Sequence, residues 1–146
     1  MKRQIVFRNN SFFVLTFLLL ISTFQVYSEE SKASQDSTFC FVGDTGNVTE
    51  VQKEVAESLA KSDCSVIWHT GDIIYPDGIS SEGDPRFFTN FLDPFKKVFD
   101  KGIPFFLTLG NHDYKKEPRS YLEIAKSNPL IVYPNNYYLK NYGRLC

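Results

Sequence analysis

Three short polar segments, each directly after an apolar run, contain the side chains best suited to chemistry in this 146-residue chain. They are Gly43-Asp44-Thr45-Gly46-Asn47, Gly71-Asp72-Ile73-Ile74-Tyr75 and Gly110-Asn111-His112-Asp113. Each apolar run is typical of a strand, so oxygen and nitrogen donors follow three strand ends. Open α/β sheets build their binding sites at that edge. A single Gly-Asp pair is weak evidence, but three such segments in order predict a metal site.

The side chains of these segments divide between two cations. Asp72 lies in the middle segment and is the natural bridge, with Asp44 on one metal and the Asn111 amide oxygen on the other. Tyr75 can reach the first metal as a phenolate, a hard donor that suits trivalent iron. Two metals about 3.5–4 Å apart can clamp a phosphate and activate water near neutral pH. His112 could donate a proton to the leaving oxygen or stabilise the charge on phosphate.

Each of these residues, taken alone, has a simpler interpretation. Asp and Asn after a strand are more often turn or cap residues, and a lone Tyr or His is more often packed or hydrogen-bonded. Their joint placement after three strands favours the metal site. Asp113 and Asp77 are interpreted as loop residues, and His69, inside the second apolar run, as a satisfied core histidine.

The elements that must position these side chains alternate between strand and helix, which predicts an α/β fold with a parallel sheet and right-handed crossovers. Asn47 and Glu50 fit a capping box at the start of the first helix. The second helix is expected to be interrupted at Asp93-Pro94. The predicted strands span 38–42, 64–70, 103–109 and 137–140, and the predicted helices span 48–60, 84–99 and 117–127.

The first 28 residues resemble a secretory signal peptide rather than part of the domain. Their apolar run is shorter than the roughly 20 residues of a membrane span and ends in small residues, with cleavage expected after Ser28. This predicts a secreted or periplasmic protein with no stable membrane span after cleavage; an uncleaved membrane anchor is the alternative. Residues 29–37 are predicted to be a disordered leader, and residues 38–146 the domain.

Charge and cysteine content limit the partners and the compartment. Without the signal-peptide cations Lys2, Arg3 and Arg8 the chain is mildly acidic, which argues against a nucleic-acid partner. The three cysteines are an odd set. Cys40 lies within an apolar run, so a buried free thiol is the favoured interpretation and a Cys40–Cys64 bridge the alternative.

The three segments together resemble the calcineurin-like metallophosphoesterase superfamily, and within it the tartrate-resistant purple acid phosphatases, over roughly residues 38–142. The general superfamily has a histidine two residues after the first Asp, where this chain has Gly46. Purple phosphatases also lack that histidine and have a tyrosine in the second motif, as Tyr75 is here. The resemblance implies a sandwich of two mixed sheets flanked by helices and hydrolysis of phosphate monoesters, generally at acidic pH.

The resemblance also implies a role for each candidate residue. Asp44, Asp72 and Tyr75 would bind iron. Asp72 and Asn111 would bind the second metal, which would be Fe, Zn or Mn. His112 would be the catalytic proton donor.

The chain departs from the family pattern after His112. Family members have further metal-binding histidines there, and this chain has only His69 and His112. It is therefore predicted to be the βαβαβ half of a metallophosphoesterase αββα sandwich, with the second sheet missing or incomplete. Phe41, Ile67 and Phe106 are expected on a sheet whose far side is poorly covered, which favours self-association.

Two functional hypotheses stay open. One is a truncated, secreted di-metal phosphoesterase acting on phosphate monoesters. The other is a non-catalytic secreted remnant or binding module derived from such an enzyme. A nucleotide-binding protein ranks last, because the chain has no Gly-rich phosphate loop.

Overall fold

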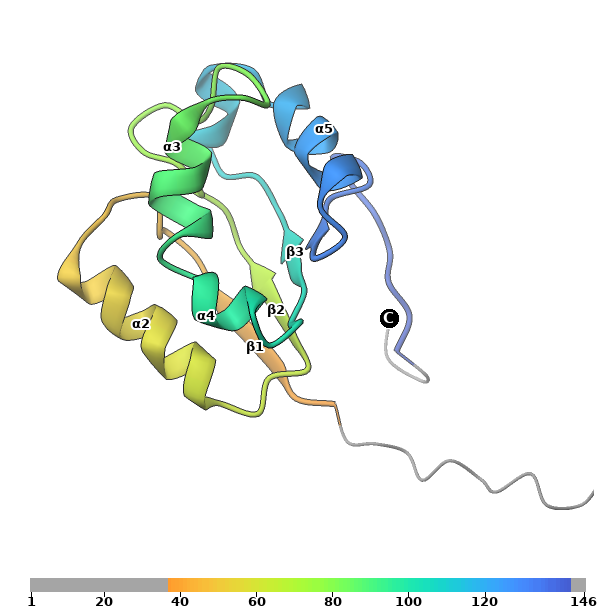
Figure 1. Ribbon diagram of the computed structural model, residues 1–146. Coiled ribbons are helices and arrows are strands. Elements are labelled where there is room, and N and C mark those ends of the chain that lie inside the picture. The colour runs from red at the N-terminus through yellow and green to blue at the C-terminus, as the bar shows by residue number, and fades with distance from the viewer. Residues whose placement is uncertain (1–36, 143–146) are drawn as a thin grey trace, which may run out of the picture. The chain divides into compact units, whose positions relative to one another are not determined.

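The computed structural model describes residues 37–142 (Figure 1). The predicted signal peptide, residues 29–36 of the predicted leader, and Cys146 lie outside the described residues. Within the part of the chain that is described, no helix has the length and apolar character needed to cross a membrane.

A four-stranded parallel sheet with the strand order β1-β2-β3-β4 forms the centre of the fold. This confirms the α/β class and the parallel topology. The predicted strand at 137–140 is wrong, because the chain forms β4 earlier, directly after the last helix. Tyr138 instead packs on Trp68 and donates a hydrogen bond to the Leu107 carbonyl. The strands are β1 (Phe39–Val42), β2 (Val66–His69), β3 (Phe105–Leu107) and β4 (Ile131–Val132).

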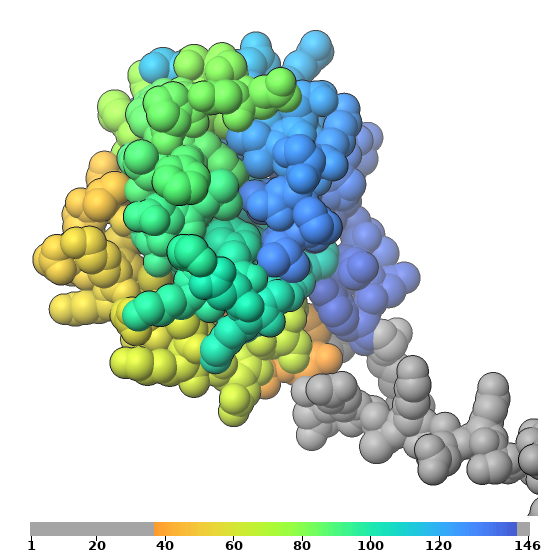
Figure 2. Space-filling view, viewed as in Figure 1, coloured from red at the N-terminus to blue at the C-terminus, as the bar shows by residue number. Residues whose placement is uncertain are grey.

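Helices cover one face of this sheet, and in the space-filling view their side chains largely hide it (Figures 1 and 2). Phe91 and Val98 from the helices, and Phe95 from the turn between them, are fully buried in one core with Ile67 and Phe105 from the sheet. The aromatic stripe in the second helical region therefore makes the core, as its spacing predicts. The helices are α2 (Glu50–Lys61), α3 (Pro85–Phe87), the π-helix η2 (Phe88–Leu92), α4 (Lys96–Phe99), the 3₁₀-helix η3 (Asp113–Lys115) and α5 (Arg119–Ser127).

The N-cap of α2 is Thr49 and not Asn47, which corrects the predicted capping box. Thr49 has an extended backbone, and its hydroxyl oxygen accepts a hydrogen bond from the Gln52 N–H at 3.1 Å. The helix begins at Glu50, so Asn47 is too far from the first turn to cap it. Glu50 pairs with Lys53 at 2.7 Å instead of closing the box.

The far face of the sheet is covered unevenly. Phe41, Trp68 and Phe106 stand in register on that face, and Phe41 is 68% exposed, as expected for a poorly covered sheet. Phe106 is only 3% exposed, because Tyr138 and Tyr142 pack against it. Ile67 faces the helices, as the alternation of side chains along β2 requires, and is fully buried.

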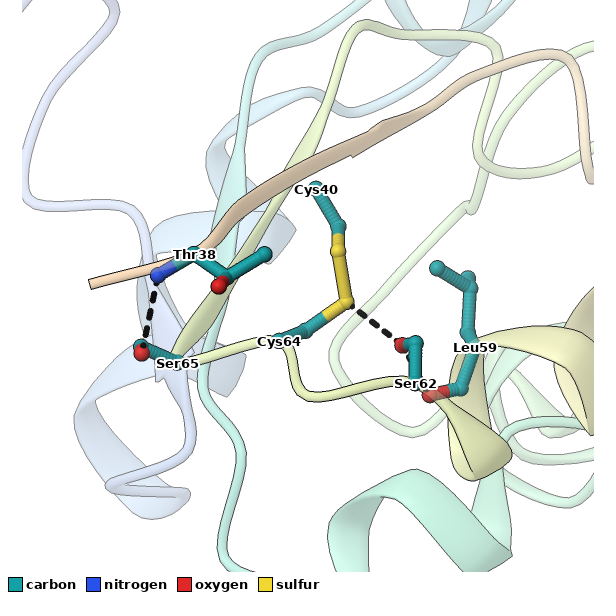
Figure 3. The surroundings of a disulfide bond; sticks show 6 residues. All are labelled: Thr38, Cys40, Leu59, Ser62, Cys64 and Ser65. Atoms are coloured by element: carbon teal, nitrogen blue, oxygen red, sulfur yellow. Dashed lines mark hydrogen bonds between the residues drawn. A yellow bond between two sulfur atoms is a disulfide. The ribbon is translucent and has the colours of Figure 1, made fainter. Parts of the chain in front are cut away.

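A disulfide joins Cys40 to Cys64, which overturns the favoured interpretation of Cys40 as a free buried thiol (Figure 3). Cys40 lies in β1, and Cys64 comes two residues before β2. Because β1 and β2 are adjacent and parallel, their amino ends meet, and the two Cα atoms lie 5.8 Å apart. That separation is within the range that a disulfide spans. The apolar surroundings of Cys40 could not reveal this pairing, which depends on strand register.

Candidate metal centre

The loops after β1, β2 and β3 leave the same edge of the sheet. Val42, His69 and Leu107 are in register at the carboxyl ends of these strands. The first two loops are also joined directly, because the Asp44 N–H donates to the Gly71 carbonyl at 3.0 Å. The parallel topology thus brings together segments that lie far apart in the sequence.

Three oxygen donors converge where the first two loops meet. The Tyr75 hydroxyl lies 2.7 Å from Asp44 Oδ1 and 2.9 Å from Asp72 Oδ2. Asp44 is exposed, Tyr75 is half-buried and Asp72 is buried. The hydrogen bond to Asp44, burial and the hydrogen bond to Asp72 all raise the pKa of Tyr75 above its ordinary value. The phenolic proton therefore lies between two carboxylates.

Asp44 and Asp72 share an uncommon backbone conformation. Their φ angles are 56° and 57°, and within residues 37–142 they are the non-glycine residues with positive φ. This left-handed region costs free energy for any residue with a side chain, although Asp tolerates it better than most. Such strain is concentrated at functional sites in proteins. The backbone therefore marks the same two residues that the sequence pattern selects.

His112 lies beside this cluster. Its backbone N–H donates to Asp72 Oδ1 at 3.0 Å, and its ring centroid is 4.5 Å from that of Tyr75. Its Nδ1 atom contacts the Pro76 carbonyl oxygen and lies 2.9 Å from Lys115 Nζ. Both contacts engage Nδ1, so Nε2 is the ring nitrogen left for a substrate.

Asn111 occupies a different position from the other candidates. It is exposed on the loop before η3, and within residues 37–142 its side chain has no hydrogen-bond partner. The structure therefore brings Asp44, Asp72, Tyr75 and His112 together and leaves the Asn111 side chain outside that network.

His69 is a hydrogen-bonded core histidine, as predicted. It is fully buried, its Nδ1 accepts from the Gly71 N–H at 3.2 Å, and its Nε2 lies 2.8 Å from the Thr45 hydroxyl. Because Nδ1 accepts, Nε2 carries the proton and donates to Thr45. Burial lowers the pKa of His69 to about 4, although Asp44 and Asp72 oppose the shift. His69 is thus a neutral link between the first two loops.

Asp113 is the important residue that sequence reasoning missed. It was expected to be an ordinary loop residue, but it is fully buried. Its carboxylate accepts hydrogen bonds from the backbone N–H groups of Ile73, Ile74 and Gly110 and from the Tyr121 hydroxyl. It therefore fixes the second loop to the third. Its place directly after His112 is the one sequence signal that could have suggested this.

Asp77, the other residue interpreted as part of a loop, lies at the surface in ion pairs with Arg86 and Lys116. These partners lower the pKa of its carboxyl group, Lys116 contributing most.

The close approach of Gly46 to the Tyr75 segment explains why this chain has glycine at position 46. A Cβ atom there would lie 2.5 Å from the Tyr75 backbone nitrogen and 2.7 Å from Ile74 Cα. No larger residue fits on this backbone, so position 46 cannot supply an imidazole. The Tyr75 hydroxyl, by contrast, does reach Asp44 and Asp72.

The donor set suits a hard cation. Two carboxylates and a phenol are all hard oxygen ligands, which trivalent iron and other hard metals prefer. Within the described residues no three His, Cys, Asp or Glu side chains gather around one point, so a metal held by Asp44 and Asp72 would need the Tyr75 phenol as a third donor. The residues therefore fit a first metal at Asp44, Asp72 and Tyr75 better than a second metal at Asp72 and Asn111.

Comparison with known proteins gives consistent results. The sequence matches the calcineurin-like phosphoesterase family over residues 37–145. It is similar to purple acid phosphatase 3 of Arabidopsis thaliana, with 28% identity over 128 residues that cover 78% of this chain and 34% of that protein. It is also similar to tartrate-resistant acid phosphatase type 5 of Mus musculus, with 27% identity over 110 residues that cover 68% of this chain and 34% of that protein.

Among solved structures, the chain resembles GAP50, described as the anchor in the inner membrane complex of Plasmodium. The TM-score is 0.58 at 23% identity, and the match covers 68% of this chain and 34% of that chain. At this identity the likeness shows the fold alone. The chain spans about a third of the length of these relatives.

Proposed function

We propose that this chain, which belongs to the calcineurin-like phosphoesterase family, contributes the first half of a two-metal centre that hydrolyses phosphate monoesters. The observation that carries the proposal is the convergence of Asp44, Asp72 and Tyr75 oxygens from two loops within hydrogen-bonding distance. Neither loop could form this donor set alone.

Each residue has a role in the proposed reaction. Asp44, Asp72 and Tyr75 would hold iron, and Asp72 with Asn111 would hold a second Fe, Zn or Mn. When bound, the metals would polarise the phosphoryl group and activate water. His112 would donate a proton to the leaving oxygen, and its backbone bond to Asp72 supports that placement.

Secretion is part of the same proposal. The Cys40–Cys64 disulfide supports an oxidising compartment, because such bonds persist in secreted and periplasmic proteins. Cleavage after Ser28 would remove the signal peptide and leave the leader, residues 29–37, in front of the domain. Retention of the N-terminal segment as a membrane anchor is the alternative. Detecting the mature N-terminus by mass spectrometry distinguishes these two outcomes.

The metal assignment can be tested by titrating the full chain with Fe³⁺, supplied as citrate, and recording visible absorption. We expect a phenolate-to-iron charge-transfer band that is lost in Tyr75→Phe and retained in Tyr137→Phe, because Tyr137 is 82% exposed and belongs to no site. Turnover of a chromogenic phosphate monoester is measured on the same samples. A band that survives Tyr75→Phe would contradict the assignment.

A non-catalytic binding module is the second candidate, and the position of Asn111 favours it. The Asn111 side chain has no hydrogen-bond partner among residues 37–142. The sequence has two histidines, His112 and the buried His69. One metal per chain without turnover supports the binding module. Two metals with turnover support the enzyme.

Self-association through the far face is also proposed, because Phe41 is largely exposed there. Sedimentation of the full chain, compared with Phe41→Ser, tests it. A monomer at all concentrations would contradict it.

A further inference from the structure

Two side-chain amides outside the donor set hold the loop that presents Asp44. Gln52, from α2, donates from Nε2 to the Thr45 carbonyl at 2.5 Å and to the Asn90 carbonyl at 2.6 Å. Asn90, from η2, donates from Nδ2 to the Gly46 carbonyl at 3.1 Å. The two carbonyls directly after Asp44 thus each receive a donor from a different helix.

These bonds satisfy groups that have little access to water. Thr45 is 6% exposed, and Gly46 is also buried. Buried carbonyl groups without a donor are costly. The Gly46 carbonyl also accepts from the Tyr75 N–H at 3.3 Å, so one peptide group connects Asn90, the Asp44 loop and the Tyr75 segment.

The orientation of the Gln52 amide supports a specific role. Reversing it would place the amide oxygen against two carbonyl oxygens, so the NH₂ group must face Thr45 and Asn90. In this orientation Gln52 Oε1 is buried without a hydrogen-bond partner among the described residues. Gln52 therefore leaves its own acceptor unsatisfied while its two donors serve the loop and η2.

The π-helix supplies a second, independent observation. In η2 the Asp93 N–H bonds to the Phe88 carbonyl five residues earlier, one residue further than in an α-helix. Phe91 stays fully buried while the Asn90 side chain reaches Gly46. Isolated π-turns occur frequently at functional sites.

We infer that Gln52 and Asn90 are positioning residues that hold Asp44 in the geometry needed to bind metal. The inference rests on the proposed function, because it assumes that Asp44 is a ligand. Partners that orient metal ligands from outside the donor set typically change metal affinity about 10–100-fold when they are removed.

The primary test is Asn90→Asp in the full chain, because Asn90 is half-buried and replacement of buried Gln52 risks unfolding. This change keeps the shape of the side chain and removes the donor to Gly46. We expect Fe³⁺ affinity, measured by competition with citrate, to fall about 10–100-fold. We also expect the Tyr75 amide to exchange hydrogen about tenfold faster without metal. If the Gln52→Glu variant folds, it should lower the Fe³⁺ affinity more than Asn90→Asp does.

Asn135→Asp is the matched control. It makes the same chemical change at an exposed residue, where Oδ1 and not the amide nitrogen forms the hydrogen bond, accepting from the Asn136 N–H at 2.8 Å. Affinity and exchange should match those of the unaltered chain. An added negative charge near a cation would by itself strengthen binding, so weaker binding in Asn90→Asp identifies positioning rather than electrostatics.

The outcomes separate this inference from the proposed function. If the unaltered chain binds no iron, the proposed function fails and this inference fails with it. If the unaltered chain binds iron and Asn90→Asp binds it equally well, this inference alone is overturned, even if the Tyr75 amide exchanges faster.

Discussion

The two ends of the central sheet are held together in different ways. At the amino end, one covalent bond joins Cys40 to Cys64 beside β1 and β2 (Figure 3). At the carboxyl end, buried polar side chains join the loops, chiefly Asp113 and His69. A disulfide constrains the chain without regard to charge, whereas the polar groups order the loops while Asp44 stays exposed for a ligand. The end that would do chemistry is thus the end that depends on hydrogen bonds.

The largest effect is expected when the carboxyl end loses Asp113. Asp113→Ala leaves several buried donors without an acceptor and should lower the free energy of unfolding by about 4 kcal/mol. Urea denaturation at neutral pH measures this loss. Asp77→Ala is the control, because Asp77 lies in ion pairs at the surface and should change stability little. Equal losses in the two variants would show that burial of Asp113 is unimportant.

Loss of the disulfide should come next. The bridge closes a loop with a sequence separation of 24, and the double variant Cys40→Ala with Cys64→Ala should lose about 3 kcal/mol of unfolding free energy. Reductant should cause a similar loss in the unaltered chain and none in the double variant. If Cys40 and Cys64 were free thiols, neither the double variant nor the reductant would change the urea midpoint.

The polar end should also make stability depend on pH through His69. Its pKa is lowered from 6.5 to about 4 in the folded chain, so the unfolded chain binds the extra proton between these values. Stability from this residue is complete above pH 6.5 and falls as the pH approaches 4, by up to about 3 kcal/mol. Urea unfolding across this window should show a weaker pH dependence in His69→Gln. An unchanged slope would contradict the neutral, buried state of His69.

The smallest effect concerns the start of α2, which follows the Asp44 loop. Thr49→Ala removes the cap and should cost about 1 kcal/mol, whereas Asn47→Ala should leave stability unchanged. Thermal unfolding of the two variants side by side measures the difference. A larger loss of stability in Asn47→Ala than in Thr49→Ala would support the predicted capping box and contradict Thr49 as the cap.

Sequence reasoning predicted those features that depend on neighbours in the chain. The strand and helix order follows from apolar runs and from the four-residue spacing of Val51, Val55 and Leu59 in α2. It failed at β4, where a two-residue strand at Ile131–Val132 is too short for any periodicity to show. The run Tyr137-Tyr138-Leu139 favoured a strand because it is apolar, but the segment is irregular: Tyr138 packs on Trp68, while Tyr137 and Leu139 are exposed.

The sequence by itself determined the family and the candidate donors, because residue type and order after each strand are local properties of the chain. Only the tertiary structure decided which of those donors meet. Parallel register brings Tyr75 to Asp44 and Asp72, joins Cys40 to Cys64, and buries Asp113 between two loops. Contacts of this kind depend on strand order, strand register and the burial of partners distant in the chain, and no local pattern encodes them.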